Sequence, residues 1–446
     1  MTGRYYSLFV IAALTAFTTA APGKIKVAEG IHLEAEFRPR LEIDGRDFSN
    51  DTGYDAYSTF RTRIGLELDG LIEKTKLYIM IGDSRTMGYA NPYLTGDPAG
   101  PNNFDNNLGV VKAYIQVHDL FSDGLYLKIG RMSNDQGRDR LFGPGNWNFY
   151  GPRTYDGLKL GYAHDAFSLN VWNFFGANGD RHWYPSSDDP SKVPNPDVDY
   201  KHDHTLTGLD LALLDKRINL LAYLDLDQNL TADTLHDERN VAVSRITTAL
   251  YAHQDWGSRK QAWGDLDVAY QFGTMGHSAG QADISAYLLA GDCGWRFEEK
   301  YKSWIGLGFH ILSGDDNTDP DKVTYFYDKY CSKHQVLGHM DFFKSETGTK
   351  SLGIRDLILR GGVNPIKDLQ CQIDLHYFTV DKSFPSAIDG SEANILGQEV
   401  DATFVYTIHK GLKSTLGIDL FFPTEDWQGQ EANAATFVYL ILQASL

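Results

Sequence analysis

The sequence has 446 residues, 42% of them hydrophobic, and a formal net charge of −18 at pH 7. This length suits two or three ordinary domains or one large barrel. Beyond the N-terminal segment there is no run of about 18 apolar residues, which excludes a helical membrane protein but not a transmembrane β-barrel, whose strands are apolar only at every second position. The acidic balance argues against nucleic acid as a partner, because phosphate-binding surfaces are normally basic.

The N-terminal residues have the pattern of a secretory signal peptide. Arg4 precedes an apolar stretch at residues 8–17, and small residues lead to a cleavage site after Ala20. The alternative is a single membrane anchor, but the apolar stretch is too short to span a bilayer. We therefore expect a signal peptide at residues 1–20 and one domain at residues 21–446.

The first element after the signal peptide is a long amphipathic strand. In "IHLEAEFRPRLEI" (residues 31–43), apolar residues such as Leu33, Phe37 and Leu41 alternate with charged ones. Successive side chains of a strand point to opposite faces, so one face of this strand is apolar and the other is almost wholly charged.

The same period of two recurs along the chain, and no long segment has the apolar period expected of a helix. A clear example is "GDLDVAYQFG" (residues 264–273), where Leu266, Val268 and Tyr270 share one face. We expect strands at residues 29–44, 56–70, 74–86, 108–119, 124–132, 154–163, 166–175, 204–213, 218–228, 241–254, 262–273, 282–297, 302–313, 353–364, 367–379, 395–409, 411–422 and 433–446.

Short connections alternate with long ones along this series. An antiparallel meander with one rim of short turns and one rim of long loops is typical of outer-membrane barrels. The sequence therefore predicts an all-β fold: a transmembrane antiparallel up-and-down β-barrel of about 18 strands, with short periplasmic turns, long extracellular loops and both termini at the periplasmic rim. Long loops are expected at residues 45–55, 87–107, 133–153, 176–203, 229–240, 314–352, 380–394 and 423–432.

This architecture explains the amphipathic strands. The barrel must close, because an unpaired sheet edge in hydrocarbon would leave backbone groups without hydrogen-bond partners. The apolar faces then meet the lipid of the bacterial outer membrane, and the charged faces line a water-filled lumen wide enough for a channel. Function should lie in this lumen, since the sequence has no nucleophile elbow, P-loop or dinucleotide fingerprint.

A patch of four arginines is expected in the lumen at the first hairpin. If the strands pair about the middle of the loop at 45–55, Arg38 faces Arg63 and Arg40 faces Arg61. Like charges directly opposite each other are destabilising, so the patch needs counter-charges. These could be anions passing through the pore, as in anion-selective channels, or an internal ladder of ion pairs with acids such as Glu36, and both can hold together.

Other charged residues also fall at inward positions, and their signs are segregated. Basic residues predominate on the early strands and acidic ones on the late strands. The basic set is Lys76, Lys112, Lys128, Lys159 and Arg360, and the acidic set is Asp210, Asp225, Asp265, Asp267, Asp374, Asp401 and Asp419.

The most distinctive stretch is "LKIGRMSNDQGRDRLFGPGNWNFYGPRTYDGLKLGY" (residues 127–162). One strand leaves the barrel through Gly130 and Arg131, and the next returns through residues 155–158. The connecting loop is rich in glycine, arginine and aromatic residues, so it could fold inward and constrict the pore.

This stretch resembles the alginate export porin family, with a Gly-Arg strand end, a "G-x-x-R-L-x-G" turn and an "[FY]-D-G-[LV]" strand start. Residues 306–326 and 397–422 are also similar to that family. The resemblance implies an eighteen-stranded outer-membrane barrel with an arginine-rich lumen that conducts an anionic polysaccharide or other solutes, and it favours a monomer. By motif, it implies lumenal or constriction positions for Arg131, Arg138, Arg140 and Arg153.

Two further patterns bear on metal binding. "GDDNTDPD" spaces Asp315, Asn317, Asp319 and Asp321 like a calcium loop, but it lacks the glycine and distal glutamate of an EF-hand. A solvated acidic loop is the favoured interpretation, with calcium between loops as the alternative. The scattered histidines form no zinc motif and are expected to be polar pore lining. No cofactor is expected.

The leading functional hypothesis is therefore a channel, not an enzyme. It would pass anionic or polar solutes, with a uronate polysaccharide such as alginate as one candidate, and an export partner on the periplasmic side is compatible with this role. Alternatives are a general diffusion porin and a loop-plugged barrel that acts as an adhesin or scaffold. An outer-membrane hydrolase is disfavoured, because outward positions are almost all apolar.

Overall fold

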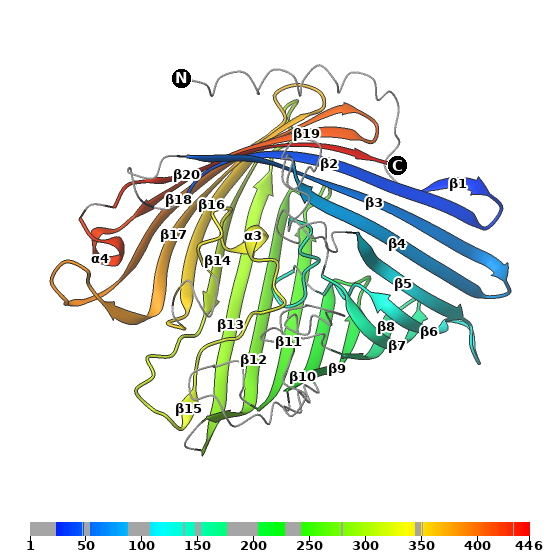
Figure 1. Ribbon diagram of the computed structural model, residues 1–446, viewed down its shortest axis with the longest axis horizontal. Helices are drawn as coiled ribbons and strands as arrows, with labels where there is room; N and C mark the ends of the chain where they lie inside the picture. The colour runs from blue at the N-terminus through cyan, green and yellow to red at the C-terminus, as the bar shows by residue number, and fades with distance from the viewer. Residues whose placement is uncertain are drawn as a thin grey trace, which may run out of the picture.

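The computed structural model is an antiparallel β-barrel whose strands follow one another in chain order (Figure 1). Residues 1–20, the expected signal peptide, lie outside the described residues. The structure describes residues 24–46, 48, 54–87, 108–136, 139–147, 153–175, 204–227, 242–277, 280–343, 349, 351–430 and 432–446.

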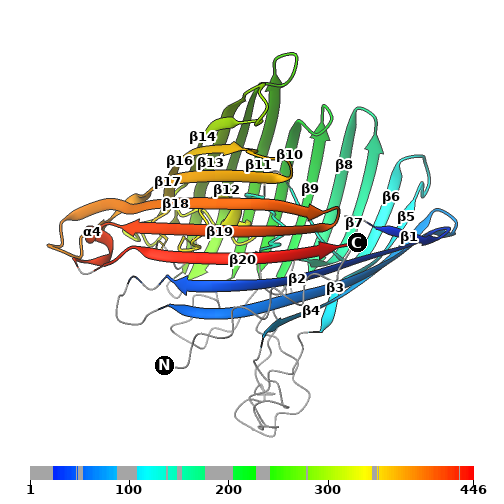
Figure 2. The same ribbon diagram turned by 90° about the horizontal axis from the view of Figure 1, so that it is seen from above.

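Within these residues, eighteen long strands form the wall, and each pairs antiparallel with its neighbours. The ring closes where the first wall strand pairs with the last (Figure 2), so the wall has no free edge that would need covering. The wall strands are β2 (Ile31–Gly45), β3 (Asp55–Ile72), β4 (Thr75–Thr86), β5 (Gly109–His118), β6 (Leu125–Met132), β7 (Tyr155–His164), β8 (Phe167–Phe175), β9 (His204–Leu213), β10 (Ile218–Asp227), β11 (Val243–Trp256), β12 (Ala262–His277), β13 (Gly280–Arg296), β14 (Trp304–Leu312), β16 (Ile354–Val363), β17 (Leu369–Pro385), β18 (Glu392–His409), β19 (Leu412–Pro423) and β20 (Ala435–Ser445).

In the described ranges, four short elements accompany the wall. β1 (Ile25–Ala28) pairs with β2, and β15 (Lys322–Val323) runs parallel to the start of β13. The one-turn helices are α3 (Lys333–Val336) and α4 (Glu425–Gln428). No helix among the described residues is long and apolar enough to cross a membrane.

The predicted fold class and strand number are confirmed, and most strand ends agree within about three residues. The largest difference is the hairpin of β17 and β18, which was expected to open near residue 379. Pairing resumes beyond an irregularity, with Phe384 opposite Ala393, so both strands continue into the expected loop.

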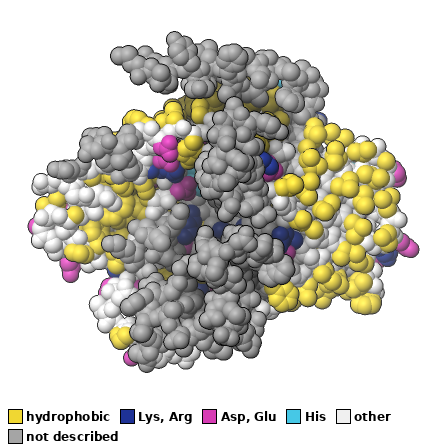
Figure 3. Space-filling model, viewed as in Figure 1, with side chains coloured by type: hydrophobic (Ala, Val, Ile, Leu, Met, Phe, Trp, Pro, Cys, Tyr) yellow, Lys and Arg dark blue, Asp and Glu magenta, His cyan; other side chains and the backbone are white. Residues whose placement is uncertain are grey.

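The outward face of the wall is apolar. On β3 and β4, Ile64 lies opposite Ile81 and Leu66 opposite Ile79, and all four side chains are exposed. Hydrophobic side chains cover the early strands at the right of Figure 3. A patch this extensive is far larger than soluble monomers expose, and it fits a lipid environment.

Aromatic side chains mark the rim of short turns. Trp256, Trp295, Phe297 and Tyr301 are all exposed there. Outer-membrane barrels carry such aromatic residues where the bilayer meets water, because the rings are apolar with a polar tip.

The interior contains two segments that fold in from the rim of long loops. We call residues 133–147, without the undescribed 137–138, the first inward loop, and residues 313–343 the second inward loop. Phe142 of the first is fully buried, with its ring centroid 5.6 Å from that of Trp172 in β8. Phe343 of the second lies 4.4 Å from Phe378 in β17. The two loops also meet, since Phe142 stacks on Tyr330 at 5.2 Å.

These contacts correct the expectation of a uniformly wet and ionic lumen. Toward the long-loop rim, inward positions of the wall are aromatic or aliphatic and form a core with the two loops. The charged side chains occupy the rest of the interior, and some are visible at the centre of Figure 3.

Candidate functional site: the charged interior

The four arginines of β2 and β3 are buried on the inward face. Arg38 lies opposite Arg61, while Arg63 lies opposite Glu36. The expected pairs, Arg38 with Arg63 and Arg40 with Arg61, are therefore wrong by two residues. Because Asp44 pairs with Asp55, the hairpin is centred between residues 49 and 50. The expected pairs would have required a centre one residue later, between residues 50 and 51.

Carboxylates beside the arginine patch supply counter-charges. Arg61 approaches Glu36 at 2.7 Å between Nη2 and Oε1, and Arg63 approaches the same oxygen at 4.0 Å. Arg40 forms an ion pair with Glu42 on its own strand. The wall itself thus carries part of the neutralising charge, as in an internal ladder.

Three arginines of the patch also hold the first inward loop. Arg38 and Arg61 donate to the carbonyl oxygen of Asn146 at 2.8 and 2.9 Å. Arg40 donates to the carbonyl of Trp147 at 3.0 Å, and its guanidinium lies 4.6 Å from the centroid of that indole ring. The arginine patch is therefore a docking site for backbone carbonyls of the loop.

Arg140 fixes the other end of the first inward loop to the opposite wall. Its Nη2 donates to Asp292 of β13 at 2.7 Å, and its Nη1 donates to Asp267 of β12. Arg140 is only 4% exposed. On the same wall, Arg360 of β16 approaches Asp292 at 3.0 Å. The loop thus bridges the basic wall and the acidic wall.

Three lysines of β5, β6 and β7 form a second basic region, which we call the lysine trio: Lys112, Lys128 and Lys159. Lys128 lies directly opposite Lys159. Their ammonium groups meet neutral partners: Ser133 at 3.2 Å, Asn134 at 2.7 Å, and the Tyr114 ring at 3.7 Å.

Within the described part of the chain, no member of the lysine trio makes an ion pair with a carboxylate. The carboxyl group of Asp135, in the first inward loop, interacts electrostatically with the trio at distances longer than an ion pair. Burial raises the pKa of this carboxyl despite the nearby lysines. Lys76, at the short-turn rim, differs from the trio because it pairs with Glu67 and Asp69 at 3.6 and 3.3 Å.

Arg131 lies on the outer face, which corrects its expected lumenal position. Its strand neighbour Ile129 is exposed to the outside, while Lys128 points inward, so residue 131 must point outward by alternation. Arg131 forms an ion pair with Asp156 of β7 at 2.7 Å, and both side chains are nearly half exposed.

Arg153 and Arg138 are the other two arginines for which the motif implies a lumenal or constriction position. Arg153 donates through Nη1 to the carbonyl of Cys331 at 3.5 Å, which joins the region of the first inward loop to the second. Arg138 lies outside the described residues.

The late strands carry an acidic wall, which includes three carboxylates that the sequence analysis missed. Asp292, Asp356 and Glu399 are buried and face inward. Asp356 was recognisable, because it shares the alternation of Arg360 on the same strand. The buried acids of this wall are Asp210, Asp225, Asp267, Asp292, Asp356, Asp374, Glu399, Asp401 and Asp419.

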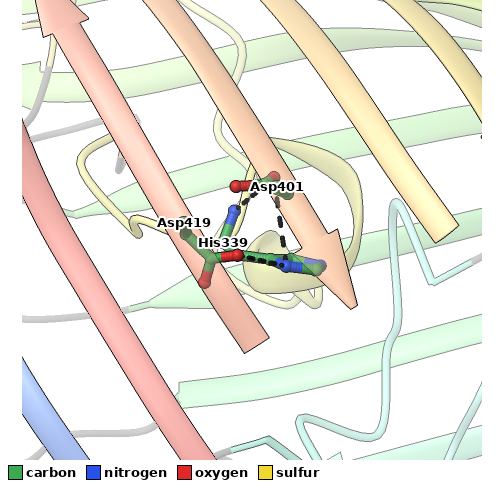
Figure 4. A group of neighbouring side chains, drawn as sticks. All are labelled: His339, Asp401 and Asp419. Atoms are coloured by element: carbon green, nitrogen blue, oxygen red, sulfur yellow. Dashed lines mark hydrogen bonds and ion pairs between the residues drawn. The ribbon is translucent and has the colours of Figure 1, made fainter. Parts of the chain in front are cut away.

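The second inward loop docks on the acidic wall. The backbone N–H of Met340 donates to Glu399 at 2.9 Å, and that of His339 donates to Asp401 at 3.1 Å. The imidazole of His339 lies 3.4 Å from Asp419 (Figure 4). Burial alone would lower the pKa of His339, but the charges of Asp401 and Asp419 outweigh it and raise the pKa to about 9.

His334 joins the two inward loops. Its ring stacks on Trp147 at 3.7 Å between centroids and on His339 at 4.6 Å. Burial lowers the pKa of His334 to about 4, although Asp341 at 3.1 Å partly offsets it. His334 is therefore neutral at pH 7 and serves as a packing surface.

The candidate calcium residues cap turns of their own loop. Asp315 accepts hydrogen bonds from the N–H groups of Asn317 and Thr324, both at 2.8 Å. Asp319 accepts one from the N–H of Asp321 at 3.1 Å and pairs with Lys322 at 2.7 Å. Over the described ranges, the one group of His, Cys, Asp or Glu with metal-ligand spacing lies elsewhere, at His339, Asp401 and Asp419.

A comparison of the sequence with models of known protein families identifies the family of this chain. The family model described as alginate export matches residues 216–439, about half of the chain. The chain belongs to the alginate export family. In this family member, the matched part includes the second inward loop and all of the acidic wall except Asp210, whereas the arginine patch and the lysine trio precede it. Among curated proteins, none matches the chain in sequence.

Solved structures with the same fold are outer-membrane porins. OccK11 (OpdR) of Pseudomonas aeruginosa has a TM-score of 0.55 at 14% identity, covering 96% of this chain and 99% of that one. A BenF-like porin from Pseudomonas fluorescens Pf-5 has 0.57 at 14%, covering 94% and 99%. OpdK of Pseudomonas aeruginosa, solved with vanillate, has 0.54 at 13%, covering 93% and 98%.

Family and fold together indicate an outer-membrane channel-like barrel in the bacterial outer membrane. The family and these structural neighbours are channels and porins rather than enzymes. The short-turn rim is then the periplasmic side and the long-loop rim the extracellular side.

Proposed function

We propose that this barrel is a channel for anionic or polar solutes, and that uronate polysaccharides such as alginate are within its range. The lysine trio carries this proposal. Three ammonium groups on adjacent strands face the interior without carboxylate partners in the described residues. A cation without a paired carboxylate in a partly desolvated wall attracts mobile anions, which is how basic pore linings select.

The arginine patch has a supporting role in this proposal. Arg38, Arg40 and Arg61 are engaged by Glu36, Glu42 and two loop carbonyls, and Arg63 approaches Glu36 at 4.0 Å. We therefore assign it to positioning the first inward loop, which narrows the interior. The acidic residues of the later strands would repel anions and keep their path on the lysine side.

Planar-bilayer recordings test this proposal. In a salt gradient, reversal potentials of the variant with Lys112→Gln, Lys128→Gln and Lys159→Gln should show an anion/cation permeability ratio lower by roughly threefold or more, because the local potential attracting anions is lost. A matched control removes three exposed lysines in short turns: Lys216→Gln, Lys260→Gln and Lys302→Gln. An equal ratio in the trio variant and the wild type would refute the lysine path.

A second candidate is a plugged barrel, because both inward loops pack into the interior with a shared aromatic core. A wild-type protein without single-channel steps would favour this candidate. Block of the current by uronate oligomers, but not by neutral oligosaccharides of equal length, would instead favour polysaccharide recognition over general diffusion.

We also propose how the chain is exported and in which oligomeric state it works. Residues 1–20 direct the chain across the inner membrane, and the mature barrel is a monomer surrounded by lipid, served by an export partner at the periplasmic rim. Transport through it needs no cofactor, and it catalyses no reaction. Size-exclusion chromatography of the detergent complex tests the monomer.

A further inference from the structure

His339, Asp401 and Asp419 come together from three separate segments. Asp401 of β18 and Asp419 of β19 lie directly opposite each other on the inward face. His339 reaches them from the second inward loop, and Figure 4 shows the three side chains turned toward one another. One ligand atom from each lies within 4.8 Å of the other two.

Both carboxylates are buried, and three of their four oxygens lack a hydrogen-bond partner among the described residues. Asp401 is 2% exposed and Asp419 is 0% exposed. In the described part of the chain, neither oxygen of Asp419 accepts a hydrogen bond, nor does Oδ1 of Asp401. Buried acceptors without partners are costly and rare in folded proteins, so three such oxygens at one point indicate a ligand.

The charge at this point is also unbalanced. Asp374 of β17 lies opposite Asp401 on its other side, so three aspartates occupy one height across three adjacent strands. Among the described residues, His339 and His376 are the two cationic side chains within ion-pair distance of this row. Like charges opposite each other destabilise a sheet, and a bound cation would remove this cost.

We propose that His339, Asp401 and Asp419 bind one divalent metal ion of the Zn²⁺ class, and that this ion fastens the second inward loop to the acidic wall. Imidazole nitrogen and carboxylate oxygen are both Zn²⁺ ligands, and three protein ligands leave a fourth position open to water. The ion binds the neutral imidazole, so His339 releases its proton to solvent on binding. Calcium would need six to eight oxygen ligands, which this set does not offer.

The spacing is close to that of this ion. Two ligands about 2.0–2.2 Å from a tetrahedral ion are about 3.3–3.6 Å apart. Nδ1 of His339 lies 3.4 Å from Oδ1 of Asp419 and 3.9 Å from Oδ2 of Asp401, so the Asp401 carboxylate would have to move a few tenths of an ångström toward the ion. Oδ2 of Asp401 accepts the backbone N–H of His339, and Oδ1 accepts no hydrogen bond from the described residues.

Neighbouring side chains support the ligands. His376 lies 3.6 Å from Asp401 through Nε2 and 2.8 Å from Asp356 through Nδ1. Such a carboxylate–imidazole chain fixes the orientation of a metal-binding carboxylate.

Cobalt substitution tests the site. The full chain, refolded in detergent without a polyhistidine tag, is titrated with Co²⁺ and followed by visible absorption. The bound Co²⁺ is then displaced with Zn²⁺. We expect one equivalent to bind, and binding at least about tenfold weaker in Asp419→Asn and in His339→Ala.

His253→Ala is the matched control. His253 also lies between two aspartates, 2.8 Å from Asp265 and 3.4 Å from Asp255, but Arg296 donates to Asp255 and Tyr251 to Asp265. This variant should bind Co²⁺ like the wild type.

Two outcomes would overturn the site: no stoichiometric Co²⁺ binding by the folded wild type, or equal binding by both ligand variants. Heat-modifiable migration in gels verifies that each variant is folded. If Asp419→Asn does not fold, His339→Ala decides alone, because it changes a loop residue and leaves the wall intact. The assay measures no transport, so it is independent of the proposed channel function.

Discussion

The arginine patch and the lysine trio are both basic, both inward and only a few strands apart, yet their surroundings differ. The guanidinium groups meet two glutamates and the carbonyls of the first inward loop. The ammonium groups meet a hydroxyl, an amide and an aromatic ring. A planar guanidinium with several fixed donors suits the positioning of a loop, whereas an ammonium group keeps its charge available. The partners of a basic side chain, more than its charge, thus decide whether it positions a loop or attracts solutes.

The largest expected effect comes from Arg140→Ala, which removes the far anchor of the loop that the arginine patch holds. It leaves Asp267 and Asp292 buried without this cation, at a cost of about 3–5 kcal/mol. Since the two inward loops pack together, Cys331 of the second loop should become accessible. Its alkylation rate, measured with Cys293→Ser and Cys371→Ser in the background, should rise at least tenfold.

Cys331 is a suitable reporter because it is unreactive in the native barrel. The thiol is buried, and burial, reinforced by Asp328, raises its pKa. The reactive thiolate is therefore scarce at neutral pH. Slow alkylation in both Arg140→Ala and the wild type would show that the loop stays in place without this anchor.

The next effect comes from neutralising the patch itself. A variant with Arg38→Gln, Arg40→Gln, Arg61→Gln and Arg63→Gln should also accelerate Cys331 alkylation, because the loop carbonyls lose their donors. Its anion/cation permeability ratio should fall less than that of the lysine trio variant. A larger fall, measured by reversal potential, would reverse the roles assigned to the two regions.

A smaller effect is expected from Glu36→Gln, which removes a carboxylate partner from the arginine patch and so makes its surroundings more like those of the lysine trio. Arg61 and Arg63 lose their shared carboxylate, so their charge becomes available to solutes. The anion/cation permeability ratio should rise modestly. Asp69→Asn, near Lys76 at the short-turn rim, is the control. No rise in Glu36→Gln would mean that the loop carbonyls alone neutralise these arginines.

The smallest effect is expected from Arg131→Ala. Its ion pair with Asp156 is nearly half exposed on the outer face, and such pairs contribute about 0–1 kcal/mol. Permeability and Cys331 alkylation should match the wild type. A changed permeability ratio would contradict the outward position of Arg131.

The wall could be predicted from the sequence because a strand fixes the face of each side chain by alternation alone. The same rule shows why Arg131 was misplaced: the motif suggested the lumen, although Lys128, three residues earlier, already occupied the inward face. The partners of Arg140 could not be predicted, because Asp267 and Asp292 lie far along the chain and no local pattern couples them. His339 was missed for the same reason, since its ligand-like neighbours belong to two different strands.

The seam between β2 and β20 has a consequence for biogenesis. Glu36 pairs with Ser445 there, so the cylinder is sealed by residues from nearly opposite ends of the polypeptide. Contacts this distant in sequence form slowly. Until this seam forms, the chain exposes two unpaired strand edges and a hydrophobic outer surface. Delivery to the membrane by a chaperone is therefore a physical requirement of this topology.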